Sequence, residues 1–268
     1  MPKFKTVSSG RYIIQDILGE GGVARVHRGF DRRTGHECAI KLLLPTLRRY
    51  PRIRERFERE AEALQALQHP NIVQMLDHGI TEDHQWIVME LVQGGSLVQR
   101  VREDGIFEWS RVVEVGIDAC DGLQAAHEQG IIHRDIKPGN LLMSRSGQVK
   151  IVDFGICHVS QATRVLTSAG VRMGSVRFMA PEQRVDAHNV GASADVFGLG
   201  VTMMALLLGR SPKRPEDELN ALDGQIPADL AYVLLRATLT EAQNRYESAA
   251  AMGKALRRLM ETQSSEQS

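Results

Sequence analysis

Hydrophobic and polar residues alternate with a two-residue period near the start of the chain. Three segments between residues 11 and 46 show this period: RYIIQDIL, VARVHRGF and HECAIKLLL, separated by a glycine-rich loop and by DRRTG. Such alternation is typical of strands that have one face in a core and the other toward water. We therefore expect a β-meander here.

The period then changes to that of a helix. In RIRERFEREAEALQALQ, the apolar residues Ile53, Phe57, Leu64 and Leu67 recur at helical spacing among charged residues, and His-Pro ends the pattern. This predicts one helix. The segments NIVQMLDHG and QWIVMELV predict two more strands, and the QGG that follows predicts a flexible joint.

Beyond the joint the pattern is mostly helical. We expect helices at 96–104 and 109–129, and around 193–208, 228–239 and 247–261. The chain is therefore predicted to be α+β, with a small β-rich part that contains one helix (11–92) and a larger α-helical part (93–261). Flexible tails are expected at 1–9 and 262–268.

Composition and charge give little support for several classes of partner. The chain has 268 residues, of which 43% are hydrophobic, and its 33 basic residues equal its 33 acidic ones. Net charge therefore favours neither nucleic acid nor a membrane surface as a partner. The three cysteines form no CxxC pair, as is typical of a reducing compartment. No signal peptide is expected, and the apolar run 196–208 is too short to cross a bilayer, so we expect a cytoplasmic protein.

The loop ILGEGGVARVHRG, residues 17–29, nearly matches GxGxxG. That pattern occurs in dinucleotide-binding units, in the nucleotide loop of protein kinases and in ordinary tight turns. A dinucleotide loop joins a strand to a helix, whereas this loop joins two predicted strands, so the dinucleotide alternative is excluded. Ala24 stands where a further glycine is expected. If its backbone needs a positive φ, alanine costs about 1 kcal/mol and weakens the binding of a nucleotide by this loop; if it does not, Ala24→Gly should change little.

The segment IIHRDIKPGNLLMSRSGQVKIVDFG carries the clearest chemistry. It places Asp135, Lys137 and Asn140 in a polar loop, followed by a short strand, a turn and a second strand that ends at Asp153. Because the turn returns the chain along the first strand, an amide oxygen and a carboxylate are expected to face one position. Mg²⁺ prefers such oxygen ligands when phosphate and water complete its coordination.

Five motifs together resemble a known family. GEGGVARV, AIK, HRDIKPGN, DFG and APE occur in the order and at the separations of eukaryotic-like Ser/Thr protein kinases, and the chain looks most similar to bacterial members. The resemblance covers about 11–259. It implies the bilobal protein kinase fold and a single kinase domain over 1–268, with an N-lobe at 11–92 and a C-lobe at 93–261.

The resemblance also implies catalytic roles. Lys41 matches the lysine that holds the α- and β-phosphates of ATP, and Glu60 matches its partner on the helix. A solvated helix face is the alternative for Glu60, but its spacing from Ile53 and Leu64 favours an inward position. Asp135 matches the residue that accepts the substrate proton, and Lys137 the residue that steadies the γ-phosphate. The implied magnesium ligands are Asn140 and Asp153.

The implied ATP site draws on the glycine loop, the strands and the joint. Its residues are Leu18, Gly19, Glu20, Gly21, Gly22, Val26, Ala39, Lys41, Met89, Glu90, Val92 and Leu142. For Val26, Ala39 and Leu142, packing in the core predicts the same apolar residues as binding does, so this alternative stays open.

A switch is implied between the DFG and APE motifs. Thr167 is the first candidate phosphate acceptor, with Ser168 and Thr163 behind it, although ordinary surface hydroxyls would look the same. Arg134, Arg56 and His158 match positions that bind such a phosphate. Ser175 matches the hydroxyl that helps to admit a Ser or Thr substrate.

Other positions imply scaffold roles or depart from the family. Glu182 with Arg245, and Asp195, resemble scaffold residues. Ser96 and Ala205 stand where kinases that select basic substrates have acidic residues. We therefore expect no preference for a basic substrate sequence. The segment 210–226 is short, and its usual helix is expected to be reduced or absent.

The main prediction is an ATP- and Mg²⁺-dependent Ser/Thr protein kinase that acts on protein substrates and is switched by phosphorylation of its activation loop. Self-association would let one copy phosphorylate another. A pseudokinase-like ATP-binding scaffold is the alternative, and a small-molecule phosphotransferase would lack APE and Ser175.

Overall fold

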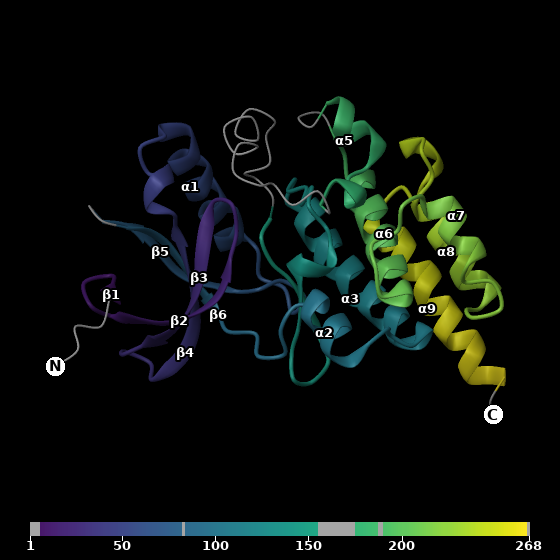
Figure 1. The fold of residues 1–268 in the computed structure, drawn as a ribbon, viewed down its shortest axis with the longest axis horizontal. Coiled ribbons are helices and arrows are strands. Elements are labelled where there is room, and N and C mark those ends of the chain that lie inside the picture. Colours follow the sequence, from purple (N-terminus) through teal and green to yellow (C-terminus); the bar gives the residue numbers. More distant parts are fainter. Residues whose placement is uncertain (1–5, 82–83, 155–174, 187–189, 267–268) are drawn as a thin grey trace. The chain divides into compact units, whose positions relative to one another are not determined.

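The computed structural model describes residues 6–81, 84–154, 175–186 and 190–266 (Figure 1). These residues fall into two compact units. Unit 1 contains 6–68, 73–81 and 84–91, and unit 2 contains 69–72, 92–154, 175–186 and 190–266. Each unit is described by itself below.

Unit 1 is built on a six-stranded antiparallel sheet. Its spatial order is β1 (Thr6–Val7), β2 (Tyr12–Glu20), β3 (Ala24–Asp31), β4 (His36–Leu43), β6 (Gln85–Glu90) and β5 (Met75–Ile80). The predicted meander is therefore confirmed. Its core contains Tyr12, Ile40, Trp86 and Val88, each no more than 4% exposed.

One helix completes unit 1. α1 (Pro51–Ala66) begins with proline, whose fixed φ and missing N–H suit the first helical turn. Its buried residues are Phe57, Glu60, Ala61 and Leu64, which follow the helical period along one face. α1 contacts β5, and a short 3₁₀ turn, η1 (Pro45–Leu47), precedes it.

The N-terminal part of the chain differs from the prediction. Thr6 and Val7 form strand β1 against β2, where a flexible tail to residue 9 was expected. Val7 is 3% exposed and packs in the same core as Tyr12. A two-residue strand is too short for its alternation to be recognised in the sequence.

The expected strand NIVQMLDHG is also wrong in its first four residues, because β5 begins at Met75. Asn71 and Ile72 belong to unit 2, where the Asn71 amide donates to the carbonyl of Val149 at 2.9 Å and Ile72 bridges Ile151. Apolar periodicity predicts an extended segment but does not show which sheet it joins.

Unit 2 is mainly helical. Its longer helices are α2 (Leu97–Asp104), α3 (Trp109–Glu128), α6 (Ser193–Leu208), α8 (Ala228–Ala237) and α9 (Ala249–Glu266). α3 packs against α9 and α6 (Figure 1). A β-carbon on Gly116 would lie 2.8 Å from side-chain atoms of Leu256 and Met203, so glycine permits this close approach.

The shorter elements of unit 2 carry the candidate chemistry. They are the 3₁₀ turn η2 (Pro138–Asn140), the hairpin β7 (Leu141–Met143) and β8 (Val149–Ile151), η4 (Ser175–Phe178), α5 (Pro181–Val185), α7 (Pro215–Asn220) and η5 (Ala242–Asn244). At the C-terminal end, α9 continues to Glu266, so the flexible tail expected from residue 262 is wrong. Within the described ranges, no helix combines the length and apolar character needed to cross a membrane.

Candidate active site

The glycine loop of unit 1 is a hairpin. β2 and β3 pair in antiparallel fashion up to Glu20 and Arg25, and the Gly21 N–H donates to the carbonyl of Ala24 at 2.9 Å. A β-carbon added at Gly19 or Gly22 would meet no atom within 4 Å. The loop thus has open space where a ligand could approach its backbone.

Ala24 needs no positive φ. It is the first residue of β3, pairs with Leu43 and is 5% exposed, and it is not among the residues with left-handed backbone. The alternative in which alanine strains the loop is therefore wrong.

Lys41 and Glu60 form a buried ion pair in unit 1. Lys41 lies on β4 and Glu60 on α1, their Nζ and Oε1 atoms are 2.5 Å apart, and their side chains are 11% and 4% exposed. Lys41 Nζ is also 6.0 Å from the ring centroid of Phe57. Glu60 therefore points inward, and the solvated alternative is excluded. Sequence reasoning missed Phe57 as a neighbour of the lysine.

The remaining candidates for nucleotide binding are divided between the units. In unit 1, Ala39 and Met89 are 8% and 6% exposed, Leu18 is 40% exposed, and Glu90 accepts from the backbone of Gln74 at 2.8 Å. Glu20 pairs with Arg25 at 2.8 Å, and Val26 is partly buried. Val92 and Leu142 belong to unit 2 and are partly buried. Packing and binding remain alternatives for Val26, Ala39 and Leu142.

Three candidate residues meet around one carboxylate in unit 2. Asp135 Oδ2 accepts from Lys137 Nζ at 2.6 Å and from Asn140 Nδ2 at 2.9 Å. The Asn140 amide also donates to the Asp135 carbonyl at 2.8 Å. Because Asp135 and Asn140 are buried and Lys137 is 23% exposed at its side chain, the loop holds a defined arrangement.

The β7–β8 hairpin brings Asp153 level with Asn140. Leu141 pairs with Ile151, and the Val152 N–H donates to the Asn140 carbonyl at 3.0 Å. Asp153 follows directly, with a left-handed φ of 58°. Since the amide nitrogen of Asn140 already donates, its oxygen is the atom that suits a cation. A carboxylate and an amide oxygen fit Mg²⁺.

Asp195 on α6 fixes the backbone next to this loop. It is 1% exposed and accepts from the backbone N–H of His133 at 2.8 Å and of Arg134 at 2.7 Å. His127 Nε2 lies 2.8 Å from the same carboxylate. The expected anchoring contact is thus present. The contribution of His127 was missed, because its place on α3 gives no distinguishing pattern in the sequence.

His133 has structural surroundings. It is fully buried, its Nε2 lies 2.9 Å from the Val152 carbonyl, and its ring centroid is 4.8 Å from that of Phe154. Burial lowers the pKa of His133, against the raising effect of the Asp195 carboxylate. A neutral ring packed in this way suits support of the loop.

The structure shows the surroundings of the three features that depart from the family pattern. Ser96 caps α2, with its side chain accepting from the Gln99 N–H. Ala205 is 5% exposed inside α6. In 210–226 the described helix is only α7, of six residues, and Arg210 binds Glu218 through two hydrogen bonds of 2.6 and 2.7 Å. A short helix is thus present in this segment, and the alternative in which it is absent is wrong.

Thr163, Thr167, Ser168 and His158 lie outside the described residues. For Ser175 only the backbone is described, in η4. The two candidate arginines are partly buried, Arg56 on α1 in unit 1 and Arg134 in unit 2 with a left-handed φ of 66°.

Comparisons with known proteins agree with the family that the motifs resemble. The family model for the protein kinase domain matches residues 12–265. The serine/threonine-protein kinase PknB of Mycobacterium leprae is 36% identical over 263 residues, which are 91% of this chain and 42% of that protein. The probable serine/threonine-protein kinase PknB of Lactococcus lactis is 34% identical over 255 residues, covering 90% of this chain and 40% of that protein. The chain thus spans less than half the length of these relatives.

Solved structures agree on the fold. The PknI kinase domain of Mycobacterium tuberculosis has a TM-score of 0.74 at 25% identity, covering 94% of this chain and 99% of that one. Rad53 1-466 in complex with AMP-PNP has a TM-score of 0.73 at 24% identity, covering 92% of this chain and 65% of that one. The fold prediction is confirmed, and the chain belongs to the protein kinase domain family, with bacterial Ser/Thr protein kinases among its relatives.

Proposed function

We propose that this domain transfers the γ-phosphate of ATP to Ser or Thr hydroxyls of proteins in a Mg²⁺-dependent reaction. The observation that carries the proposal is the Asp135 carboxylate, which one lysine and one asparagine of the same loop hold within 3 Å. The relatives named above support the Ser/Thr class of substrate.

Each residue has a chemical role in this proposal. Asp135 accepts the proton of the attacking hydroxyl, and Lys137 places positive charge beside it. Lys41, oriented by Glu60, holds phosphate oxygens. When bound, Mg²⁺ supplies further positive charge at Asn140 and Asp153. Because phosphoryl transfer has a loose anionic transition state, positioning and positive charge provide most of the catalysis.

An assay with labelled ATP, Mg²⁺ and a generic protein substrate tests the chemistry. Asp135→Asn removes the proton acceptor and should lower transfer roughly 10²- to 10⁴-fold. Asp223→Asn, which changes an exposed carboxylate in a turn, is the matched control and should keep the wild-type rate. Wild-type transfer by Asp135→Asn would disprove the catalytic assignment.

The pseudokinase alternative predicts binding without transfer. In that case ATP raises the Tm of the wild type, but no labelled phosphate reaches any protein. The joint presence of Lys41, Glu60, Asp135, Asn140 and Asp153 favours the active kinase.

We also propose control by phosphorylation of the activation loop, with Thr167 as first acceptor and Ser168 and Thr163 as alternatives. Arg134 supports this, because Asp195 fixes its backbone beside Asp135. Arg56 and His158 are the other proposed phosphate ligands. Mass spectrometry after incubation with ATP should find phosphate in this segment. An unphosphorylated segment, together with full activity of Thr167→Ala, would refute the switch.

Self-association belongs to the same proposal. If one copy phosphorylates another, the initial rate of autophosphorylation should rise with the square of protein concentration, whereas a first-order rate would exclude it.

A cytoplasmic site of action is proposed because Cys38 and Cys120 are free buried thiols, as is usual in reducing compartments.

A further inference from the structure

Gln183 is a buried polar residue near the start of α5 in unit 2. It is 9% exposed, and it follows Glu182, whose carboxylate binds Arg245. It belongs to none of the candidate sites described above. A buried amide needs partners for its oxygen and its nitrogen, because an unpaired buried group costs about 1–3 kcal/mol. The partners of Gln183 therefore show what its position requires.

The two ends of the Gln183 amide bind different segments. Its Oε1 accepts from the Ala180 N–H at 3.1 Å, and its Nε2 donates to the Arg134 carbonyl at 2.9 Å. The first bond sets the orientation of the amide, because a backbone N–H can only donate and must therefore face the oxygen. A hydrogen-bond donor is thus directed at the chain immediately before Asp135.

The Arg134 carbonyl belongs to the peptide group that leads into Asp135. The N–H of the same peptide group donates to His133 Nδ1 at 3.1 Å. Gln183 and His133 therefore hold the two polar atoms of one peptide group. Because a peptide group is planar, these two bonds fix the orientation of the plane from which the Asp135 side chain projects.

The backbone at Arg134 requires support of this kind. Its φ of 66° lies in the left-handed region, where a residue other than glycine is strained by about 1–3 kcal/mol. The Arg134 N–H donates to Asp195 Oδ1 at 2.7 Å, so α6 holds this residue at its nitrogen and α5 holds it at its carbonyl. Without the bond from α5, the peptide group before Asp135 can rotate toward a less strained conformation, and the carboxylate moves with it.

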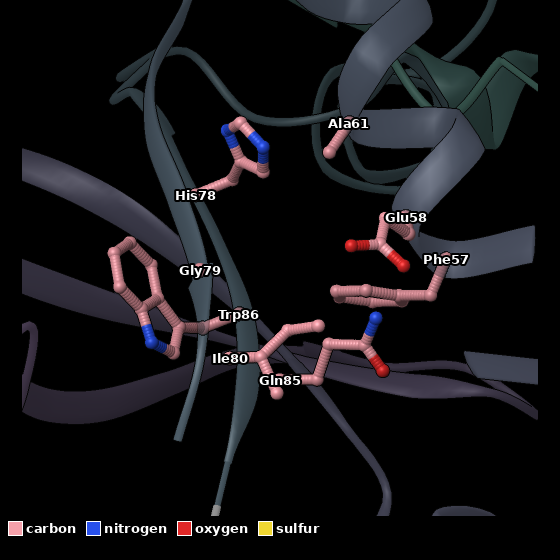
Figure 2. A pocket seen from close by; sticks show the side chains of 8 residues that line it. All are labelled: Phe57, Glu58, Ala61, His78, Gly79, Ile80, Gln85 and Trp86. Atoms are coloured by element: carbon pink, nitrogen blue, oxygen red, sulfur yellow. The ribbon is translucent and has the colours of Figure 1, made fainter. Parts of the chain in front are cut away.

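Burial alone does not explain the use of both ends of the amide. Gln85 in unit 1 is 4% exposed and its Nε2 donates to the Arg54 carbonyl at 3.0 Å, but its Oε1 has no partner among the described residues. Figure 2 shows Gln85 at the wall of a cavity of about 150 Å³, which is lined by residues of α1, β5 and β6. A buried glutamine of this chain can therefore be bonded at one end only, whereas Gln183 is bonded at both.

We propose that Gln183 is a positioning residue for phosphoryl transfer, because its bond to the Arg134 carbonyl keeps the Asp135 carboxylate in the direction of the attacking hydroxyl. The inference rests on the proposed function, in which Asp135 accepts the proton. Both bonds of the Gln183 side chain go to backbone groups, so its effect is exerted through the loop. The chemical step depends on this bond, and the binding of ATP does not.

Steady-state kinetics of Gln183→Met test the proposal, since methionine keeps the length of the side chain and removes the donor. The value of kcat should fall roughly tenfold or more, because a small displacement of a reacting group has an effect of this size. The KM for ATP should stay within about twofold of the wild-type value. Gln225→Met is the matched control, because the exposed Gln225 also donates to a backbone carbonyl, that of Ala221 at 2.8 Å. It should keep the wild-type kcat and KM.

Gln183→Glu provides a measurement that a role in packing alone would not affect. A protonated carboxyl group can donate to the Arg134 carbonyl, whereas an ionised carboxylate cannot and would repel the carbonyl oxygen. The ratio of variant to wild-type kcat should therefore rise as the pH is lowered from alkaline to mildly acidic, at a temperature at which thermal unfolding shows both proteins to be folded. The titrating groups of the loop and of its surroundings are common to both proteins, so the ratio removes their contribution: Asp135, His133, His127, Asp195 and Glu182.

Three kinetic results would overturn the proposal: an unchanged kcat in Gln183→Met, an effect of this variant on the KM for ATP alone, or a ratio for Gln183→Glu that does not depend on pH. Hydrogen–deuterium exchange tests the loop without catalysis. The backbone amides of 133–135 should exchange faster in Gln183→Met than in the wild type or in Gln225→Met. If the wild type transfers no phosphate, the proposed function fails, while faster exchange still supports the hold of Gln183 on the loop and unchanged exchange refutes it.

Discussion

The ion pair between the buried Arg245 and the partly exposed Glu182 allows a quantitative prediction for unit 2. The Arg245 side chain is 0% exposed and its two terminal nitrogens donate to both Glu182 carboxylate oxygens, at 2.7 and 2.8 Å. Its remaining bonds go to the backbone carbonyls of Ser193, Leu239 and Thr240 at 2.7–3.0 Å. All five hydrogen bonds are lost in Arg245→Ala.

The expected loss of unfolding free energy is about 1.5–3 kcal/mol, because a fully buried guanidinium with five hydrogen bonds is removed while the 29% exposed Glu182 keeps access to water. Arg257→Ala is the matched control. Arg257 pairs with Asp121 in the same unit, but these side chains are 43% and 38% exposed, so the loss of this ion pair should cost no more than about 1 kcal/mol. Urea unfolding followed by circular dichroism measures both. Equal losses of less than 1 kcal/mol would refute the argument from burial.

The same pair predicts a dependence on pH. Burial tends to raise the pKa of Glu182, but the hydrogen bonds and charge of Arg245 outweigh it, and the pKa is lowered. The ionised carboxylate therefore contributes stability above its unfolded pKa, and this contribution is lost as the pH falls through the folded pKa. The stability difference between wild type and Glu182→Gln should shrink with falling pH below about 4.5. A constant difference would contradict this assignment.

Three further predictions concern backbone and thiols. Gly94→Ala should lower the free energy of unfolding in urea by more than about 1 kcal/mol, because the added β-carbon would overlap a backbone carbonyl oxygen. Gly139→Ala is the control and should cost less than about 1 kcal/mol, because its β-carbon would have no neighbour nearer than 3.9 Å. Ala24→Gly should lower stability by about 0.5–1 kcal/mol and leave the KM for ATP unchanged, because this strand position needs no positive φ. Burial raises the pKa of Cys38 to about 11 and also raises the pKa of Cys120. In a variant whose third cysteine is replaced by serine, iodoacetamide at pH 8 should therefore label neither thiol until urea unfolds the chain. A lower KM for Ala24→Gly, or labelling of the native protein, would contradict these predictions.

Local patterns in the sequence predicted the elements and the inward position of Glu60. Alternation predicted the hairpin of the glycine loop, and helical spacing placed Glu60 on the face of α1 that carries Leu64. The turn before Val149 was sufficient to predict that Asp153 returns to the level of Asn140. In each case the contact is made between segments close in sequence, or on a face that the period defines.

Contacts between distant segments were not predictable in the same way. The bridge from Ile72 to Ile151 and the contact from His127 to Asp195 join segments more than 60 residues apart. Neither residue type nor spacing marks such partners. The cavity between Phe57 on α1 and the strands β5 and β6 is a similar case, because its walls depend on how the helix packs on these strands. A helical period predicts which face of a helix is buried, but it does not predict where the packing leaves a cavity.

The glycines of the chain differ in what they require from their surroundings, and this distinction bears on function. At Gly94 a side chain is excluded by the protein itself, since a backbone carbonyl occupies the space. At Gly19 and Gly22 a β-carbon would meet no atom within 4 Å, and neither residue has a positive φ. Neither packing nor backbone conformation therefore explains glycine at these two positions. Close approach of a ligand to the backbone does explain it, and this agrees with Ala24, which is an ordinary strand residue. The hairpin thus supports the proposed phosphate site through the two glycines that the fold does not need.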